Sequence, residues 1–312
     1  MKTEARVAPP AALRALLTGA IDYAGLFPPC SLAVEPALHN HAEYVRSPDA
    51  WMLGAFVLPV TKFEDAAPCL VQFDPQHRLR ISALGAKSEN DATFLPAVET
   101  AKHAIVAFNT THGPIALVDQ LEMALPVKID SALLERVGET LTEVGLPTFW
   151  EAPADEAERV IAFVAEHNER SGRTFGFKLR TGGVVASAFP SAIQIARALI
   201  AAVKHAVPIK FTAGLHHPVR LFHASVQGKM HGFLNVLGAG VLVAEHGWSL
   251  QQTATMLEDE DASAFSFADD RFTWREFSVS AERIRAHRRL ITSLGSCSFD
   301  EPREDLRALQ LL

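Results

Sequence analysis

The fold is decided by residues 174–214, which read TFGFKLRTGGVVASAFPSAIQIARALIAAVKHAVPIKFTAG. Thr174–Gly182 and Val207–Gly214 are rich in β-forming residues and alternate in polarity, which predicts two strands. The segment between them, Ser187–Ala206, has the composition and length of a helix. A strand, a helix and a second strand in this order predict two parallel strands joined by a helical crossover.

The same alternation runs through the chain before this segment, where helical stretches such as Ser131–Val144 and Asp155–Glu169 separate short β-rich runs. The further strand candidates are Ala20–Phe27, Trp51–Val60, Arg80–Gly85, Pro114–Pro126 and Leu146–Ala152. A (β/α)8 barrel needs ~250 residues, so a chain of 312 residues fits one barrel with short extensions. We therefore predict a single (β/α)8 barrel domain over residues 1–312. A doubly wound sheet is the alternative, but no glycine-rich dinucleotide motif follows the first strand.

The eighth strand has two candidates. Phe272–Val279 has a β-rich composition, whereas Phe233–Val243 is apolar enough to be either a strand or a buried helix. We place the eighth strand at Phe272–Val279.

Composition excludes several classes of partner. The chain has 36 acidic and 29 basic residues, a net charge of -7 and no long basic run, so we expect no nucleic acid partner. Cys30, Cys69 and Cys297 are too few and too far apart for a disulfide framework or a cysteine zinc site, which favours the cytoplasm.

Arg14 interrupts the only apolar stretch near the N-terminus, so we expect no signal peptide. The longest apolar stretch, Gly232–Ala244, is shorter than the ~20 residues of a membrane span, so we expect no membrane association.

Basic side chains alternate with apolar ones in both strands of the opening segment. Lys178 and Arg180 share one face of the first strand, and Lys210 and Thr212 share the same face of the second. These side chains would point into the barrel near the carboxyl ends of the strands, where active sites of this fold are built. Structural salt bridges are the alternative, but three cations at adjacent strand ends favour a functional site.

Two glutamates can meet these cations, and an aspartate is a further candidate for the site. Alternation places Glu122 on the inward face of the fourth strand, and Glu151 ends the fifth, with Phe149 inward and Trp150 outward. Either glutamate could serve in proton transfer or only neutralise a cation. Asp22, near the end of the first strand, could contact a hydroxyl in the site or cap the following loop.

Three short stretches resemble the deoxyribose-phosphate aldolases. Val118–Leu125 resembles their acidic strand, Phe177–Gly182 their Schiff-base strand and Ile209–Gly214 their second-lysine strand. The order acid, lysine, lysine is the same, and the resemblance implies a Schiff base on a lysine. The chain departs from the family at Glu122, where the family has aspartate, at Leu179-Arg180 after the lysine, and in having no clear phosphate cradle. Residues 21–29 and 212–218 also resemble uncharacterised bacterial proteins, and this resemblance does not point to any particular activity.

A lysine that forms an imine must first lose its proton, and a neighbouring cation lowers its pKa from ~10.4. At a separation of ~6 Å and an effective dielectric near 20, the repulsion is about 2.8 kcal/mol, or about two pKa units. We therefore expect Lys210 and Arg180 to bring the pKa of Lys178 towards neutrality.

From the sequence we predict a lyase of class I aldolase type that needs no cofactor and acts on a small oxygenated carbonyl or oxo-acid substrate. Lys178 would form the imine, Lys210 would tune its pKa and Glu122 would act as acid and base. The predicted substrate-binding residues are Arg180, Thr212, His216, Glu151 and Asp22. A homo-oligomer is possible from the sequence.

Two other functions remain open. A metal-dependent isomerase or hydrolase would use Glu151 and His216, with His231 as a further ligand, but the histidine spacing fits no ligand motif and we predict no metal. His217 follows His216 directly, so only one of the two side chains would enter a pocket. A non-catalytic barrel that binds anions is the other alternative. We expect His231 and Asn235 to belong to a buried polar network.

Overall fold

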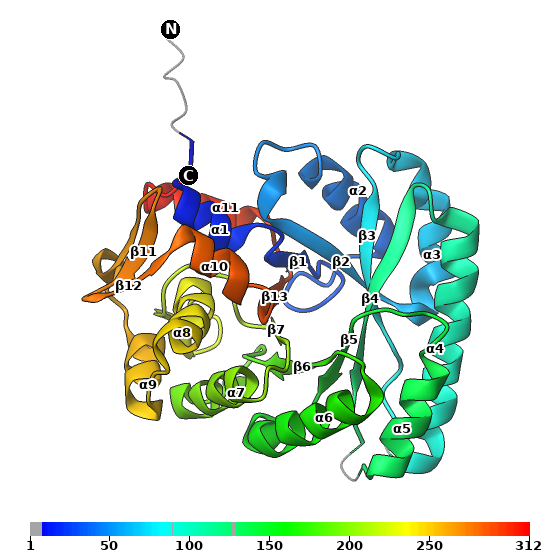
Figure 1. Ribbon diagram of the computed structural model, residues 1–312. Helices are drawn as coiled ribbons and strands as arrows, with labels where there is room; N and C mark the ends of the chain where they lie inside the picture. Colours follow the sequence, from blue (N-terminus) through cyan, green and yellow to red (C-terminus); the bar gives the residue numbers. More distant parts are fainter. Residues whose placement is uncertain (1–7, 89, 127–128) are drawn as a thin grey trace, which may run out of the picture.

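Eight parallel strands close into a barrel in the computed structural model, which describes residues 8–88, 90–126 and 129–312 (Figure 1). The strands are β1 (Ile21–Tyr23), β2 (Leu53–Pro59), β3 (Leu79–Leu84), β4 (Ala116–Ala124), β5 (Thr148–Glu151), β6 (Phe175–Arg180), β7 (Ile209–Thr212) and β13 (Ile291–Ser296). Their order around the barrel is β1-β13-β7-β6-β5-β4-β3-β2, and β2 pairs with β1 to close it. The predicted (β/α)8 barrel is confirmed.

Helices surround this barrel (Figure 1). They are α1 (Ala11–Leu17), α2 (Val34–Tyr44), α3 (Phe63–Ala66), α4 (Asp91–His112), α5 (Ser131–Thr140), α6 (Ala157–Ser171), α7 (Ala192–Lys204), α8 (Phe233–His246), α9 (Leu250–Glu258), α10 (Ala281–His287) and α11 (Asp300–Ala308).

Helix α7 shows how the sequence sets the boundaries of an outer helix. The Ser191 hydroxyl accepts the backbone N–H of Gln194, and the Gln194 side chain accepts the N–H of Ser191, so both N-terminal donors are satisfied. Ile195, Leu199 and Ala202 recur at helical spacing and are fully buried. The apolar stretch Ala186–Lys204, which contains α7, is long and apolar enough to cross a membrane. Because α7 contacts α6, α8 and α9, its apolar face is already covered by the barrel's outer layer.

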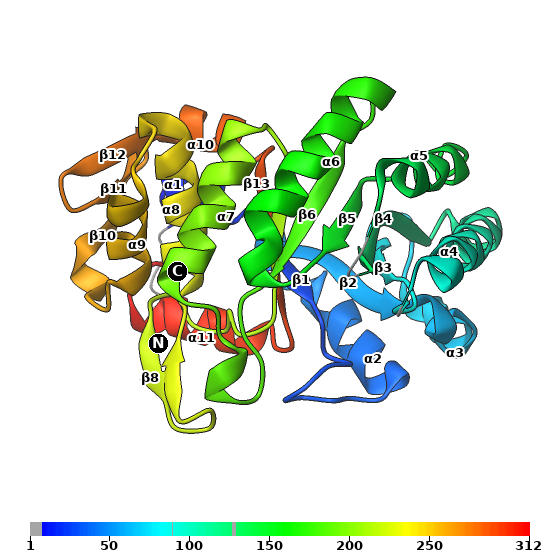
Figure 2. The ribbon, with the colours of Figure 1, turned by 90° about the horizontal axis from the view of Figure 1, so that it is seen from below.

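The eighth strand lies at Ile291–Ser296, so our placement at Phe272–Val279 is wrong. Phe272–Val279 is β-structured, but it belongs to an antiparallel sheet of β10 (Phe265–Phe267), β11 (Arg271–Trp274) and β12 (Phe277–Ser280). This sheet lies outside the barrel, beside α8 and α9 (Figure 2). Phe233–Val243, the other candidate, forms most of helix α8. A second extension is the hairpin of β8 (Leu221–His223) and β9 (Gly228–Met230).

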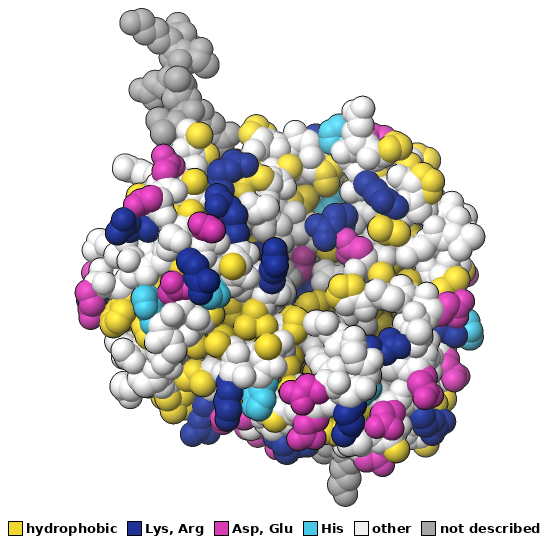
Figure 3. All heavy atoms as spheres, viewed as in Figure 1, with side chains coloured by type: hydrophobic (Ala, Val, Ile, Leu, Met, Phe, Trp, Pro, Cys, Tyr) yellow, Lys and Arg dark blue, Asp and Glu magenta, His cyan; other side chains and the backbone are white. Residues whose placement is uncertain are grey.

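The barrel interior differs from the layers of branched aliphatic side chains that usually fill this fold. Small residues such as Ser82, Gly176, Ser293 and Gly295 occupy barrel strands, which leaves room for long charged side chains. In Figure 3 the face of the molecule has a hollow at its centre, with acidic and basic side chains visible inside it. The centre of the barrel is therefore polar, and the aliphatic core lies between the strands and the helices.

Candidate active site

A cavity of about 390 Å³ opens at the carboxyl ends of the strands. Five of the predicted site residues line it, namely Glu151, Lys178, Arg180, Thr212 and His216. The loop after β1 and the segment 183–188 after β6 supply most of its apolar wall. The cavity is therefore at the end of the barrel where active sites of this fold lie.

Glu122 lies between the two lysines. Its Oε2 is 2.7 Å from Lys178 Nζ and its Oε1 is 2.5 Å from Lys210 Nζ. The Ser82 hydroxyl also donates to Oε1. All three ionised side chains are at least 95% buried. Because β6 and β7 pair with Lys178 directly opposite Lys210, the sheet register brings the two lysines to one carboxylate.

Asp22 continues the cluster below Lys210. Its Oδ2 is 2.9 Å from Lys210 Nζ and accepts the Ser293 hydroxyl at 2.7 Å, while its Oδ1 accepts the backbone N–H of Ala55. Asp22 therefore fixes Lys210 and does not cap the loop after β1, and the hydroxyl that it contacts belongs to the barrel wall.

Glu151 continues the cluster above Lys178. Its Oε2 is 2.8 Å from Lys178 Nζ, and its Oε1 accepts a long hydrogen bond of 3.4 Å from Arg180 Nε. The Arg180 side chain is 55% exposed, so this cation lies at the rim of the barrel and not inside it. Phe149 points inward, with its ring 5.3 Å from Lys210 Nζ, and Trp150 packs outward against Phe94, both as the strand alternation predicts.

These contacts form one chain of alternating charge: Asp22, Lys210, Glu122, Lys178, Glu151 and Arg180. We call this set the charge chain. It runs from inside the barrel to the rim of the cavity, and its three acids balance its three bases.

The ion pairs decide the protonation of the lysines. Burial alone would lower the pKa of Lys178, but Glu122 and Glu151 outweigh burial and hold that pKa above its ordinary value. Burial likewise opposes the charged form of Lys210, whose pKa is nevertheless raised by Asp22 and Glu122. The pKa of Glu122 lies below its ordinary range because both lysines outweigh its burial. Our expectation that Lys178 approaches a neutral pKa is therefore wrong for the resting site, where carboxylates and not cations are its nearest charges.

The histidine segment after β7 contributes one side chain to the cavity. His216 lines it, with Nδ1 3.1 Å from Glu301 Oε2 and 3.4 Å from Ser296 Oγ. His217 does not line this cavity, and its Nδ1 is 2.7 Å from Asp305 Oδ2. Both histidines, however, line a smaller cavity of about 130 Å³ and face Glu301, so our prediction that one pocket receives only one of them holds for the larger cavity and is wrong for the smaller one.

His231 and Asn235 are structural, also as predicted. His231 Nε2 is 2.7 Å from the Pro190 carbonyl oxygen, and its Nδ1 faces Arg220. Asn235 is fully buried, donates to the Met256 and Asp259 carbonyls, and accepts the backbone N–H of Arg220.

The ligand set of the metal-dependent alternative is not assembled. The two ring nitrogens of His231 are taken up by Pro190 and Arg220, so this residue does not join Glu151 and His216. Over residues 8–88, 90–126 and 129–312, no group of three or more His, Cys, Asp or Glu side chains has a geometry suited to a metal ion.

Sequence reasoning missed four polar side chains around the site. Ser82 lies in the predicted strand Arg80–Gly85, on the same face as Arg80, so strand alternation could have placed it inward. Ser293 belongs to the eighth strand, which we placed elsewhere in the sequence, and Cys297 directly follows that strand. Glu301, on α11, comes too far along the chain for any strand pattern to reveal its contact with His216.

The fold and the site together define the chain as a (β/α)8-barrel protein with a buried lysine-carboxylate cluster beneath its carboxyl-end cavity. No protein-family model and no curated protein matches the sequence.

Proposed function

We propose that this protein is a lyase of class I aldolase type that forms a Schiff base between Lys178 and a small oxygenated carbonyl or oxo-acid substrate. One observation carries the proposal: Lys178 lines the cavity while two carboxylates hold its Nζ in place. The order of acid, lysine and lysine on β4, β6 and β7, and the resemblance of these stretches to deoxyribose-phosphate aldolases, support the same chemistry.

Lys178 is the nucleophile of this proposal because it lines the cavity. Lys210 is 1% exposed and lies beneath Glu122, where it contacts two carboxylates and the face of Phe149. Lys210 is thus a positioning residue that holds Glu122.

Imine formation balances within the cluster. Lys178 gives one ammonium proton to Glu122, and the free amine attacks the carbonyl carbon to form a carbinolamine. The carbinolamine hydroxyl leaves as water with the proton from Glu122, which yields an iminium ion. The iminium carries the positive charge that the lysine had, so Glu122 is again paired with it once the water has left.

Carbon–carbon cleavage then follows from a hydroxyl group β to the iminium carbon. Glu151 takes the proton of this hydroxyl, the carbon–carbon bond breaks, and its electron pair flows to the iminium to give an enamine and a free aldehyde. Glu151 returns the proton to the enamine carbon, and water releases the second product. Arg180 binds an anionic substituent of the substrate, and Thr212 and His216 bind its hydroxyl groups.

The first test is reductive trapping. Borohydride added with glycolaldehyde, glyceraldehyde or pyruvate should leave a secondary amine on Lys178, located by peptide mass mapping. Lys178→Met should abolish the adduct, whereas Lys62→Met, a change at an exposed lysine on the surface, should not alter it.

The result also separates the alternatives. An adduct on Lys210 would exchange the roles of the two lysines. Turnover of a substrate without any adduct would rule out the Schiff base, and binding of small acids without adduct or turnover would favour a non-catalytic barrel.

A further inference from the structure

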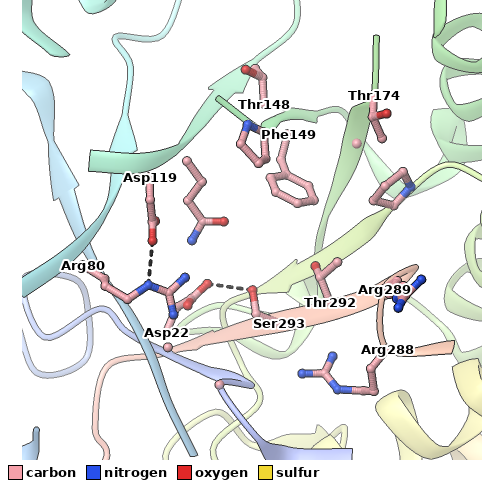
Figure 4. Close-up of a pocket in the computed structure, with 16 residues that line it drawn as sticks. Asp22, Arg80, Asp119, Thr148, Phe149, Thr174, Arg288, Arg289, Thr292 and Ser293 are labelled. Carbon is pink, nitrogen blue, oxygen red and sulfur yellow. Dashed lines mark hydrogen bonds and ion pairs between the residues drawn. The ribbon is translucent and has the colours of Figure 1, made fainter. Parts of the chain in front are cut away.

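A second cavity, of about 450 Å³, opens at the other end of the barrel, where the strands begin (Figure 4). Thr174 and Pro208 directly precede β6 and β7, and Thr292 and Ser293 lie near the start of β13. Its floor reaches Asp22, the deepest member of the charge chain. The buried ion pairs above Asp22 separate this cavity from the one that Lys178 lines.

Three arginines line this cavity from two sides. Arg80 lies with Asp119 on one side, and Arg288 and Arg289 lie on the opposite side (Figure 4). Arg80 Nε donates to Asp119 Oδ2 at 2.6 Å, so this cation is paired. Among the described residues, neither Arg288 nor Arg289 forms an ion pair with a carboxylate, although the two terminal nitrogens of Arg288 donate to the backbone carbonyls of Ile291 and Thr18. Asp22 offers them little compensation because Lys210 and Ser293 already occupy its Oδ2.

Two polar atoms at this cavity are buried without a partner in the described part of the chain: Arg288 Nε and Asp119 Oδ1. A buried donor or acceptor without a partner costs about 1–3 kcal/mol, so such atoms are usually satisfied by water or a ligand. Burial lowers the pKa of Arg288 to about 10, which leaves it a cation at neutral pH.

We infer that this cavity is a second ligand site, for a small oxyanion that also carries a hydroxyl group. The Arg289 guanidinium and the unpartnered Nε of Arg288 hold the oxyanion, since guanidinium groups suit carboxylate and phosphate oxygens. Asp119 Oδ1 accepts the hydroxyl at the opposite wall. The two arginines without a carboxylate partner thus bind the oxyanion end of the ligand, and Asp119 Oδ1 binds its hydroxyl end.

Calorimetric titration of the whole protein tests this site with three probes: inorganic phosphate, glycerol 3-phosphate and glycerate. The two hydroxylated probes should bind more tightly than phosphate. The tighter of the two identifies the oxyanion as a phosphate ester or a carboxylate. Arg289→Met should weaken all three probes by about tenfold or more, because it removes a charged hydrogen-bond donor. Arg197→Met, at an exposed arginine on α7, is the matched control and should bind like the wild type.

Two further variants make the test specific. Asp119→Asn should remove the preference for the hydroxylated probes and leave phosphate binding close to that of the wild type. Lys178→Met should bind all three probes with unchanged affinity. The test of this second ligand site is therefore independent of whether Lys178 forms a Schiff base. Arg289 is exposed, and its variant is expected to fold. Equal binding by wild type and Arg289→Met, or no saturable binding up to about 10 mM, would overturn the site.

Discussion

Glu151 is the residue through which the charge of Lys178 can be adjusted from the cavity. Of the two carboxylates on this lysine, Glu151 is the more exposed and, within the described part of the chain, contacts no second lysine. Its loss removes one of the two charges that raise the pKa of Lys178, while Glu122 still holds the side chain in place.

Glu151→Gln should therefore lower the pKa of Lys178, and the rate of imine trapping should begin to rise at a pH about one unit lower than in the wild type. The direction follows because the neutral amine attacks, and a lower pKa provides it at lower pH. Cyanoborohydride trapping across a pH series measures the shift. Glu156→Gln, at an exposed residue that pairs with Arg159, should leave the profile in place. A shift to higher pH in Glu151→Gln would contradict the ion-pair account.

At the scale of single residues, the sequence predicted that Glu122 and the two lysines point inward, but it did not predict the direction in which the pKa of Lys178 shifts. Strand alternation alone placed Lys178, Lys210 and Glu122 on the inner face, because side-chain direction has a period of two residues. The direction of the pKa shift was wrong because it depends on distances between strands far apart in the chain. Glu122 and Lys210 are 88 residues apart, yet their charged atoms are 2.5 Å from each other.

At the scale of elements, the first seven barrel strands were predictable and the eighth was not. Strand β13 carries Ser293 and Gly295 on its inner face, where Asp22 and Thr212 need small neighbours. The strand therefore lacks the inward apolar residues that mark a buried strand. Phe272–Val279 has a strong β composition because it forms a real sheet, in which Phe272 and Trp274 are buried outside the barrel.

The Asn235 side chain on α8 donates hydrogen bonds to backbone carbonyls at the end of α9, and its substitution tests how much these hydrogen bonds contribute to stability. Asn235→Ala would remove three hydrogen bonds and leave the buried Asp259 carbonyl and the part-buried Arg220 N–H without this partner, while the Met256 carbonyl keeps the Asp259 N–H, so we expect a loss of about 2–4 kcal/mol in the free energy of unfolding. Urea denaturation measures the change. Gln251→Ala, at an exposed position on α9, should change stability by less than about 0.5 kcal/mol. A loss as small in Asn235→Ala as in the control would show that water replaces the three hydrogen bonds.

At the scale of the whole molecule, the charge chain is a balanced set, so its members should not contribute independently. Lys210→Met removes the lysine that pairs with Asp22 and leaves an excess negative charge in the barrel, which should cost about 3–5 kcal/mol of stability. Asp22→Asn in the same chain restores neutrality and should recover part of this loss.

Urea denaturation of both single variants and the double variant gives the coupling energy. We expect Lys210→Met to become relatively more stable as the pH falls, because an orphaned buried carboxylate takes up a proton more readily in the folded state. Additive losses in the double variant would show that charge balance does not hold the barrel centre together.

The pairing of β1 with β13 has a consequence for how the molecule is made. Asp22 leaves the ribosome first, and Ser293, which donates to it, follows 271 residues later. Seven strands of the nascent chain can assemble as an open, curved sheet, but the edges of β1 and β7 stay unpaired until Ile291–Ser296 arrives. The buried ions of the barrel are thus enclosed only after β13 has been synthesised and completes the wall around them.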